Sequence, residues 1–486
     1  MPLPVNPTGR PRRSVLLIGS EARPFSKTGG LADVLGALPP ALQRLGWDAT
    51  VVLPRYRGVS AGALAETFPV TVGGYVREAG FYEAPLADGA RAVLVDCPDL
   101  YDRPGLYTVD NTDYPDNARR FAFLVRAALE LAARRGAGPS VVHAHDWQAG
   151  LAPVYLRSIY ASHPVLGGTP GIFTIHNIAY QGVFEPDWLP RLDLGWDQFA
   201  VDRLEFYGRV SFLKGGITDA RIVTTVSRRY AEEIQTPAFG FGFDGILRAR
   251  AADLVGILNG IDVSEWDPAR DPFLPTPFDV ADPSGKRDAK LAVLGRYGLP
   301  ADEAALKRPL IGMVSRMVDQ KGFDLIAATL ENLARLDAAF VVLGTGEPRY
   351  QDMWRSFAAR HPDRIAAHIG FDESLAHVIE GGADIFLMPS RFEPCGLSQM
   401  YAQRFGSLPI GHQTGGLAET IVDGETGFLF THPSTESFLG GLCRAFATFG
   451  AKDRLNSMRR SAMSQSFSWD ISAACYGALY RKAVPP

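Results

Sequence analysis

The sequence has few cysteines, no long apolar run and no surplus of positive charge. It contains four cysteines in 486 residues, far apart and without a Cys-x-x-Cys pair. This usage predicts neither a zinc site nor a disulfide framework, and it is typical of a reducing cytoplasm. No run approaches the roughly 20 apolar residues that span a bilayer, so we expect no membrane partner. The 49 basic and 53 acidic residues give a formal net charge of -4, which argues against binding to nucleic acid.

Two arginines near the N-terminus precede a short apolar stretch, as they would in a signal peptide. The stretch Val15–Gly19 is shorter than the roughly 7–15 residues of such a peptide's apolar region, and Glu21 and Arg23 follow directly. We therefore expect a flexible tail that leads into a first β-strand.

The chain does have a regular alternation of apolar runs and amphipathic helical stretches. Continuous runs rich in Val, Ile and Leu are typical of strands buried on both faces of a parallel sheet. The length exceeds what one hydrophobic core usually organises, and strand–helix–strand connections build open α/β sheets. We therefore predict the α/β class, with two doubly wound Rossmann-like domains facing a central cleft. The predicted strands are Ser14–Ser20, Asp48–Leu53, Arg91–Cys97, Ser140–His145, Gly171–His176 and Arg221–Ser227, then Leu310–Ser315, Ala339–Leu343, Arg364–Ile369, Ala383–Met388 and Leu408–Gly411.

The two predicted domains comprise residues 1–256 and 257–467. Early in the second, Trp266–Asp288 is rich in Pro and Asp and lacks periodicity, so we expect a surface crossover there. The final segment, 468–486, has a helical pattern and would pack back on the first domain.

Glycine pairs follow two of the predicted strands, at the carboxyl ends where ligands of open α/β sheets bind. Such loops let backbone N–H groups at a helix start approach an anion. For the first loop taken alone, a tight turn around a solvated lysine is an equally good interpretation. The residues concerned are Lys27, Gly29 and Gly30 after the first strand, and Gly415, Gly416 and Leu417 after the strand at Leu408–Gly411.

Histidine and acidic side chains end two other strands of the first half. His143, His145 and Asp146 end one strand, and His176 ends the next. Such side chains can hydrogen-bond sugar hydroxyls, which both donate and accept. Because strand residues alternate, His143 and His145 should share one face and Asp146 the other, so at most one subset reaches a ligand. For any one of these histidines a core position is the commoner outcome, and a metal site is less favoured because no third ligand has a suitable spacing.

Two cations and a glutamate follow strands of the second half. Arg316 and Lys321 lie at a strand end and at the next helix start, where a planar fork and a point charge could clamp a diphosphate. A solvated basic loop is the alternative. Glu393 precedes a predicted helix, where a carboxylate is favoured as a cap, so this role competes with sugar binding.

One glycine motif is a decoy. Residues 240–245 match Gly-x-Gly-x-x-Gly, but no hydrophobic strand precedes them. The dinucleotide-binding motif needs that strand, so we expect a loop here and no nicotinamide cofactor.

Taken together, these segments resemble the bacterial and plant glycogen and starch synthases, two-domain glycosyltransferases of the GT-B class. The resemblance runs through nearly the whole chain. It implies an enzyme that transfers glucose from ADP-glucose to the non-reducing end of an α-1,4-glucan such as glycogen, with retention of configuration and release of ADP. The segments that carry it are KTGGLADV, LYDRPGLY, YPDNARRFA, VVHAHDW, FTIHNIAYQG, SFLKGG, VTTVS, EIQTP, GILNGID, VSRMVDQKG, PSRFEPCGL and TGGLAET.

In the second domain, the resemblance implies that Arg316 and Lys321 neutralise the leaving nucleotide diphosphate. Glu393 resembles the essential glutamate near the donor glucose hydroxyls, and Cys395 lies beside it. The loop 415–417 resembles the phosphate-facing loop. The sequence contains no Asp-x-Asp triplet to hold a metal, so we predict a metal-independent reaction that relies on electrostatic stabilisation by the two cations.

In the first domain, Lys27 and its glycine loop resemble the element that meets the donor diphosphate. Asp146 and His176 match polar residues of the sugar pocket. Asn259, at the start of the predicted second domain, matches a residue that lines the cleft. The resemblance implies no cofactor, and a front-face displacement in which the leaving diphosphate helps to deprotonate the acceptor.

Three positions depart from the pattern of these synthases. Gly411-His412-Gln413 stands where one or two basic residues often precede TGGL, Gln148 where some members have histidine, and Glu419 where aspartate is common. The alternatives left open are a related transferase that uses UDP-glucose and a non-catalytic glucan-binding protein on the same scaffold. A phosphorylase is less favoured, since no lysine context typical of pyridoxal phosphate is present.

Overall fold

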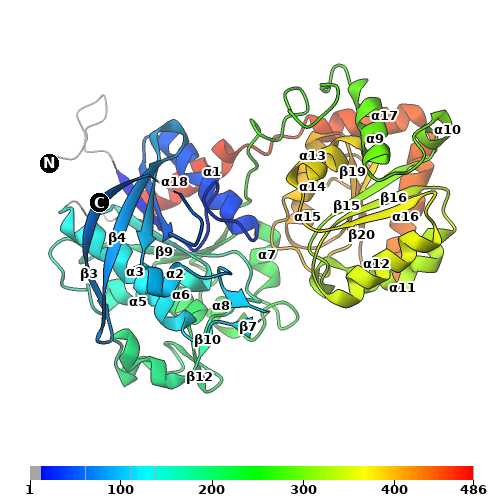
Figure 1. Ribbon diagram of the computed structural model, residues 1–486. Helices are drawn as coiled ribbons and strands as arrows, with labels where there is room; N and C mark the ends of the chain where they lie inside the picture. The colour runs from blue at the N-terminus through cyan, green and yellow to red at the C-terminus, as the bar shows by residue number, and fades with distance from the viewer. Residues whose placement is uncertain (1–12, 61, 111, 137, 485–486) are drawn as a thin grey trace. The chain divides into compact units, whose positions relative to one another are not determined.

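The computed structural model describes residues 13–60, 62–110, 112–136 and 138–484 (Figure 1). The expected N-terminal tail, up to residue 12, lies outside these residues. The chain forms two compact units, which are described separately below. Unit 1 comprises residues 1–260 and 469–486, and unit 2 comprises residues 261–468.

Unit 1 is built on a nine-stranded sheet with the order β14-β13-β9-β8-β1-β2-β5-β4-β3. The seven strands from β14 to β5 are parallel, and β4 and β3 add an antiparallel hairpin at one edge. All six strands predicted for the first half are present. The strands of this sheet are β1 (Ser14–Ile18), β2 (Asp48–Pro54), β3 (Ala63–Val72), β4 (Tyr75–Pro85), β5 (Arg91–Asp96), β8 (Val141–His145), β9 (Gly171–Ile175), β13 (Ile222–Thr225) and β14 (Leu254–Gly256). Outside it, β6 (Thr108–Val109) pairs with β7 (Thr112–Asp113), and β10 (Val183–Phe184), β11 (Glu205–Phe206) and β12 (Arg209–Ser211) form a three-stranded sheet.

The hairpin β3–β4 was not predicted, because its strands do not form continuous apolar runs. In β3, buried Phe68, Val70 and Val72 alternate with exposed residues. Such alternation is the pattern of an antiparallel strand with one solvated face, and Gly73-Gly74 supplies the turn, both with positive φ.

The C-terminal helix α18 packs on α1 in unit 1 (Figure 1). Tyr480 of α18 meets Trp47 edge-on, with ring centroids 5.1 Å apart, and Arg44 of α1 pairs with Asp470 at 2.6 Å. The last helix therefore completes the core of the first unit. The helices of unit 1 are α1 (Gly30–Arg44), α2 (Pro98–Tyr101), α3 (Asn117–Arg134), α4 (Asp146–Ala149), α5 (Leu151–Arg157), α6 (Phe212–Asp219), α7 (Arg228–Glu233), α8 (Asp244–Ala249) and α18 (Trp469–Ala483). Residues 240–243 of the glycine motif form a loop, as expected, whereas Asp244 and Gly245 already belong to α8.

Unit 2 contains a parallel six-stranded sheet with the order β17-β16-β15-β18-β19-β20. The five strands predicted for the second half are present, and the short β20 is an addition. The strands are β15 (Leu310–Val314), β16 (Ala339–Gly344), β17 (Ile365–Ile369), β18 (Ile385–Met388), β19 (Leu408–His412) and β20 (Phe428–Phe430), and the helices are α9 (Gly285–Arg296), α10 (Glu303–Leu306), α11 (Phe323–Ala334), α12 (Pro348–Arg360), α13 (Glu373–Gly382), α14 (Ser398–Arg404), α15 (Gly415–Thr420), α16 (Thr435–Gly450) and α17 (Lys452–Met463).

The sheet of unit 2 has a hydrophobic core on each face, as a doubly wound sheet requires. Alternate residues of β16 enter opposite cores: Phe340 and Val342 pack with α11, α12 and α16, whereas Val341 and Leu343 pack with α9 and α13. This alternation follows from the strand period of two. It explains why both sets of residues had to be apolar, which gave the run its continuous appearance.

The expectation of a surface crossover at Trp266–Asp288 is wrong in part. Trp266, Leu274 and Phe278 are buried, and α9 already begins at Gly285. Trp266 is sandwiched between His377 and Tyr401, with ring centroids 3.8 and 3.7 Å away. Proline and aspartate remove helical periodicity but do not prevent isolated aromatic side chains from entering the core.

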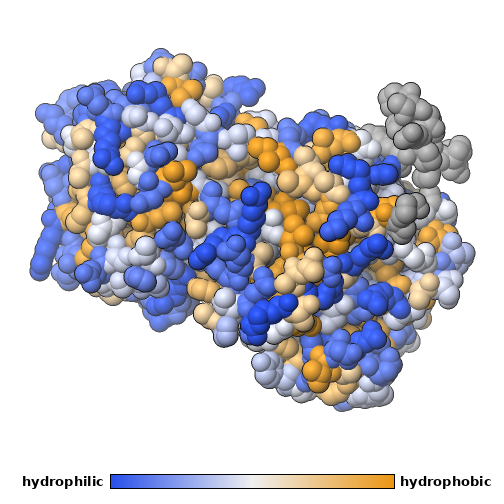
Figure 2. Space-filling view, turned by 180° about the vertical axis from the view of Figure 1, so that it is seen from behind, coloured by the Kyte–Doolittle hydropathy of each residue, from blue (hydrophilic) through white to orange (hydrophobic). Residues whose placement is uncertain are grey.

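No helix in the described part of the chain has both the length and the apolar character to cross a membrane. The face drawn in Figure 2 carries hydrophilic residues interspersed with hydrophobic ones.

Candidate active site

Each sheet has a switch point between two neighbouring parallel strands, from which the strand order continues toward opposite edges of the sheet. In unit 1 it lies between β1 and β8, and in unit 2 between β15 and β18. Ligands of open α/β sheets bind beyond the carboxyl ends of the strands at such points. Most predicted site residues follow these strands and their neighbours β9 and β19, so the sheet order brings them together within each unit. Asn259 instead follows β14, at the edge of the sheet of unit 1.

In unit 1, the glycine loop after β1 is anchored by Glu21. This side chain is 3% exposed. Its carboxylate accepts hydrogen bonds from the backbone N–H groups of Thr28 and Gly29 and from the Thr28 hydroxyl. Tyr107 donates its hydroxyl to the same carboxylate. Two N–H groups of the predicted anion-binding loop are therefore already satisfied by the protein.

Lys27 is held beside α1 by Asp33. Its ammonium nitrogen lies 2.7 Å from an Asp33 carboxylate oxygen, and the lysine side chain is 35% exposed. Arg23 approaches the same oxygen at 3.5 Å. The cation is thus pre-positioned at the carboxyl end of β1, where an incoming phosphate would compete with Asp33 for it.

The histidines after β8 and β9 form a direct contact. His145 Nδ1 lies 3.0 Å from His176 Nε2, and one of these nitrogens donates a hydrogen bond to the other. Burial lowers the pKa of His145 well below its usual value and that of His176 to about 3. Both rings are therefore neutral near pH 7, and they offer hydrogen bonds rather than charge to a sugar.

Asp146 does not continue the alternation of strand β8. Its φ of 56° is left-handed, which ends the strand and turns the carboxylate toward the end of β9. There it accepts a hydrogen bond from the backbone N–H of His176 at 2.7 Å. Asp146 and His176 consequently lie together, although strand geometry placed Asp146 opposite the histidines. Burial raises the pKa of Asp146 to about 7.

His143 has the core role that was the commoner expectation. Its Nδ1 contacts the Tyr480 hydroxyl at 2.7 Å and its Nε2 contacts the Thr174 hydroxyl at 2.6 Å. Asn259 is also buried, and its side-chain oxygen has no hydrogen-bond partner among the described residues. Asn259 thus remains a candidate for a ligand contact, whereas His143 does not.

In unit 2, Glu393 and Lys321 form an ion pair across the switch point, in which the glutamate is buried and the lysine partly buried. The ammonium of Lys321 lies 2.6 Å from Glu393 Oε2, with the glutamate side chain 6% exposed. The Ser390 hydroxyl donates to the same oxygen at 2.9 Å. Glu393 lies five residues before α14, so it is not the cap of that helix. The pair places a cation and an acceptor oxygen side by side at the carboxyl ends of β15 and β18.

Three glycines allow the loops of this site to pack backbone against backbone. A Cβ atom at Gly322 would lie 2.0 Å from the Pro389 carbonyl oxygen, and one at Gly415 would lie 1.9 Å from that of Glu393. A Cβ at Gly416 would lie 1.9 Å from the Cys395 carbonyl oxygen. Only glycine fits such contacts, so the backbone at Glu393 and Cys395 is held directly against the glycine loop, and the backbone at Pro389 against Gly322.

The glycine loop before α15 also uses part of its own hydrogen-bonding capacity. The N–H of Gly416 donates to the Glu393 carbonyl at 3.0 Å, and the Leu417 side chain is fully buried in the core. A phosphate contact from Leu417 would have to come from its backbone. Cys395 is buried and is not part of a disulfide.

The departure at Gly411-His412-Gln413 has a structural explanation. His412 is buried, and its Nδ1 donates to the carbonyl oxygen of Ser390 at 3.0 Å. This residue therefore ties the end of β19 to the loop that carries Glu393. Arg316, two residues after β15, is exposed, in keeping with a cation that can reach a ligand.

Each unit supplies cations that a ligand can reach, Lys27 in unit 1 and Arg316 and Lys321 in unit 2. Unit 1 adds neutral hydrogen-bonding groups, and both kinds of group suit a sugar phosphate. The starch synthase catalytic domain family matches residues 14–249, and the group 1 glycosyl transferases match residues 300–448. The chain is 46% identical over 477 residues to the glycogen synthase of Anaeromyxobacter dehalogenans, which covers 97% of this chain and 100% of that protein.

The chain belongs to the glycogen synthase family. It is 47% identical over 473 residues to glycogen synthase 1 of Bradyrhizobium diazoefficiens, covering 94% of this chain and 98% of that one. The solved catalytic domain of starch synthase IV from Arabidopsis thaliana, bound to ADP and acarbose, is 32% identical with a TM-score of 0.90, and the match covers 97% and 99% of the two chains. The chain is thus a glycosyltransferase with the GT-B fold. A sucrose-phosphate synthase from Thermosynechococcus elongatus, 17% identical with a TM-score of 0.63, shares the fold.

Sequence reasoning about this glycogen synthase family member missed the contacts of Glu21, Tyr107 and Ser390, and it noted His412 only as part of the departure at 411–413. Glu21 directly follows the first predicted strand, so its place at a carboxyl end was a usable signal. His412 likewise follows the predicted strand Leu408–Gly411. Tyr107 gave no such signal, because its partner Glu21 is distant in the sequence.

A separate cavity of about 590 Å³ lies in unit 1. It is lined by Val201, Glu205, Tyr207, Lys214 and Phe243 among others, and by none of the candidate site residues. The Lys214 ammonium donates to the carbonyl oxygens of Val201 and Glu205, so its charge is used within the protein.

Proposed function

We propose that this member of the glycogen synthase family transfers glucose from ADP-glucose to the non-reducing end of an α-1,4-glucan, with retention and release of ADP. The observation that carries the proposal is the Lys321–Glu393 pair at the switch point of unit 2. The similar Arabidopsis domain is bound to ADP and acarbose, which supports an adenine nucleotide as the donor's carrier.

On the donor side, Arg316 and Lys321 would neutralise the leaving diphosphate. Lys321 is held by Glu393, and arrival of the diphosphate would offer the ammonium a stronger anionic partner. Glu393 would then accept hydrogen bonds from glucose hydroxyls. Because charge develops on the diphosphate as the glycosidic bond breaks, two fixed cations stabilise the transition state more than the bound donor.

On the acceptor side, Asp146, His176 and Asn259 would bind sugar hydroxyls. His176 is a neutral hydrogen-bonding group, and the Asn259 side-chain oxygen is an unsatisfied acceptor. Lys27 would meet the donor diphosphate from unit 1, released from Asp33. The loops at 29–30 and 415–417 would approach the phosphates with those N–H groups that the protein does not use itself.

The first experiment is glucose transfer to glycogen from ADP-glucose and from UDP-glucose in parallel, with EDTA present. Strong incorporation from ADP-glucose supports the donor and metal independence together. Incorporation from UDP-glucose alone would keep the mechanism and overturn the donor. Activity that EDTA abolishes and Mg²⁺ restores would overturn metal independence, and no transfer from either donor would favour a glucan-binding protein.

The second experiment replaces Glu393. Glu393→Gln should lower kcat by about 100-fold or more, because lost electrostatic groups in active sites cost about that much. Glu331→Gln is the control, since Glu331 pairs with Arg360 on the exposed surface of the same unit. A near-normal kcat in Glu393→Gln would remove Glu393 from the mechanism. Lys27→Gln should mainly raise the KM for donor; a change confined to the glucan KM would contradict the assignment.

We also propose a cytoplasmic location. None of the four cysteines, all of which lie in the described part of the chain, forms a disulfide, as is usual in a reducing compartment. Fractionation of the source cells with an antibody to this chain tests it.

A further inference from the structure

His377 in unit 2 has an unused nitrogen in a buried position. The residue lies on α13 and is 1% exposed. Its Nδ1 lies 2.6 Å from Asp271 Oδ2, and the Asp271 side chain is fully buried. An ionised carboxylate can only accept, so Nδ1 carries the proton and Nε2 has a free lone pair. Nε2 is buried and has no hydrogen-bond partner among the described residues.

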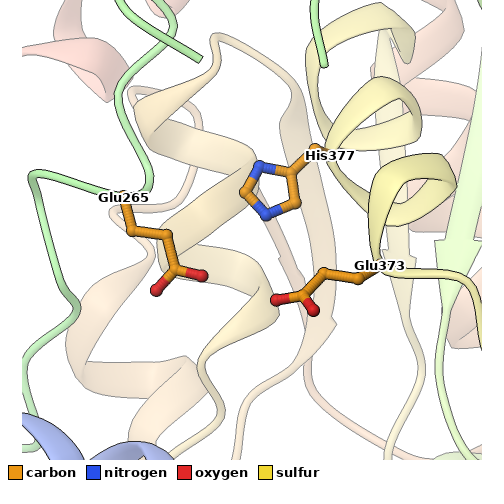
Figure 3. Close-up of side chains that lie close together, drawn as sticks. All are labelled: Glu265, Glu373 and His377. Atoms are coloured by element: carbon orange, nitrogen blue, oxygen red, sulfur yellow. The ribbon is translucent and has the colours of Figure 1, made fainter. Parts of the chain in front are cut away.

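Two carboxylates meet this nitrogen. Glu373 begins α13, one turn before His377, so both side chains lie on the same face of the helix. Glu265 comes from the segment that enters unit 2. One ligand atom from each of the three residues lies within 4.8 Å of the others. Figure 3 shows both carboxylates directed toward the space below the imidazole ring.

The arrangement has the features of a metal site rather than of a chance acidic cluster. A buried acceptor nitrogen without a partner is costly, and a cation would remove that cost. Metal-binding histidines usually donate their other ring N–H to a carboxylate, which fixes the tautomer and ring orientation. Asp271 does this here, and Trp266 stacked 3.8 Å from the ring restricts it further.

The ligand set identifies the class of ion. One imidazole nitrogen and two carboxylates suit zinc better than magnesium or calcium, which prefer oxygen alone. With bonds of about 2.0–2.1 Å, tetrahedral zinc brings its ligand atoms to about 3.3 Å from one another. The three atoms therefore need to close in by a modest rotation of the two glutamates. Glu373 is exposed, which leaves an entry path and room for a water as fourth ligand.

We propose that His377, Glu265 and Glu373 bind one Zn²⁺ ion, which clamps the segment around Glu265 and Trp266 to α13. The ion is structural: its ligands include none of the residues assigned to glucose transfer. The proposal does not depend on the proposed donor or acceptor.

The test uses the full chain, stripped with a chelator and dialysed. Titration calorimetry with Zn²⁺ should give one site per chain, and zinc should raise the melting temperature. Glu265→Gln and Glu373→Gln should each weaken zinc binding by at least about 100-fold and remove the thermal shift, because loss even of an outer-shell partner costs about 10- to 100-fold. Both replacements keep the side-chain size, so the fold should persist.

Glu436→Gln is the matched control. Glu436 is an exposed glutamate in the first turn of α16, as Glu373 is in α13, so it reports the loss of helix-dipole stabilisation alone. This variant should bind zinc as the unaltered chain does. No zinc binding, or equal binding by the unaltered chain and both ligand variants, overturns the proposal. If Nε2 instead pairs with the glutamates through a proton or a water, the chain will not bind zinc at this stoichiometry.

Discussion

Replacement of Gly416 by alanine tests how the glycine loop of unit 2 acts on Glu393. Gly416 has no left-handed φ, so alanine is acceptable to the backbone itself. The added Cβ would lie 1.9 Å from the Cys395 carbonyl oxygen and 2.5 Å from two further backbone atoms of that residue. The perturbation is therefore purely steric, and it acts on the segment two residues after Glu393.

The size of the effect follows from these distances. Cβ atoms essentially never approach closer than 3.0 Å, so the Glu393–Cys395 segment or the start of α15 must retreat by about 1 Å. The Gly416 N–H bond to the Glu393 carbonyl stretches with it. Misplacement of a reacting group by about 1 Å costs about 100-fold in rate, and overpacking costs about 1–3 kcal/mol of stability.

The assay is glucose transfer from ADP-glucose to glycogen, with kcat and the donor KM measured separately and the melting temperature recorded. We expect Gly416→Ala to lower kcat about 100-fold with little change in donor KM. Gly440→Ala is the control, because Gly440 lies inside α16 with nothing within 4 Å of an added Cβ. Alanine there should leave activity unchanged and raise stability by about 0.5–1 kcal/mol.

Two results would refute the reasoning. A Gly416→Ala variant with the kcat and melting temperature of the unaltered chain would show that the loop tolerates the contact. An increase in donor KM at constant kcat would show instead that the glycine serves the approach of phosphate, and that Glu393 keeps its position.

Three further predictions concern unit 1. Glu21→Gln should lower stability by about 1–3 kcal/mol and raise the donor KM, because it sets an amide donor against the N–H groups of the glycine loop. The control is Glu185→Gln, which breaks an exposed ion pair with Arg209. It should change neither stability nor the donor KM in the same assays. Burial lowers the pKa of His143 to about 3 in the folded protein. As pH drops below about 6.5, the unfolded chain therefore takes up a proton that the folded chain does not, and stability falls. His143→Gln should remove this slope, about 1.4 kcal/mol per pH unit, from the free energy of urea unfolding between pH 6.5 and 5. The pKa of Asp146 is raised to about 7, so its contribution to folding stability is present at low pH and is lost as pH rises through 7. Asp146→Asn keeps the acceptor oxygen for the His176 N–H and should flatten the decline of stability between pH 4 and 7. An unaltered slope would mean that Asp146 is solvated.

The positions of the buried strands could be predicted because burial on both faces leaves a local signal. A strand such as β16 has apolar side chains facing two cores, so its whole sequence is apolar. The edge strand β3 and its hairpin partner β4 carry a weaker alternating pattern, which a prediction from continuous apolar runs does not include. In the same way, the stacking of Trp266 between His377 and Tyr401 could not be read from the Pro- and Asp-rich segment around it.

The sequence predicted which residues belong to the candidate site better than it predicted the contacts between them. The carboxyl ends of successive strands identified Lys27, His176, Lys321 and Glu393 as neighbours of a ligand. The sequence did not show that Glu393 pairs with Lys321, 72 residues away. It also did not show that the N–H groups of Gly29 and Gly416 are taken by the protein's own acceptors.

The sequence by itself determined the α/β class, the buried strands and the loops that carry polar residues, because these depend on patterns within about 20 residues. Only the tertiary structure decided which loops meet, since that depends on the order of strands in each sheet. It placed β18 beside β15 and so Glu393 beside Lys321, and it turned Asp146 toward His176 through one left-handed residue. It also brought Glu265 to His377. Trp266, the next residue after Glu265, is buried against His377, and this contact holds their segment on α13.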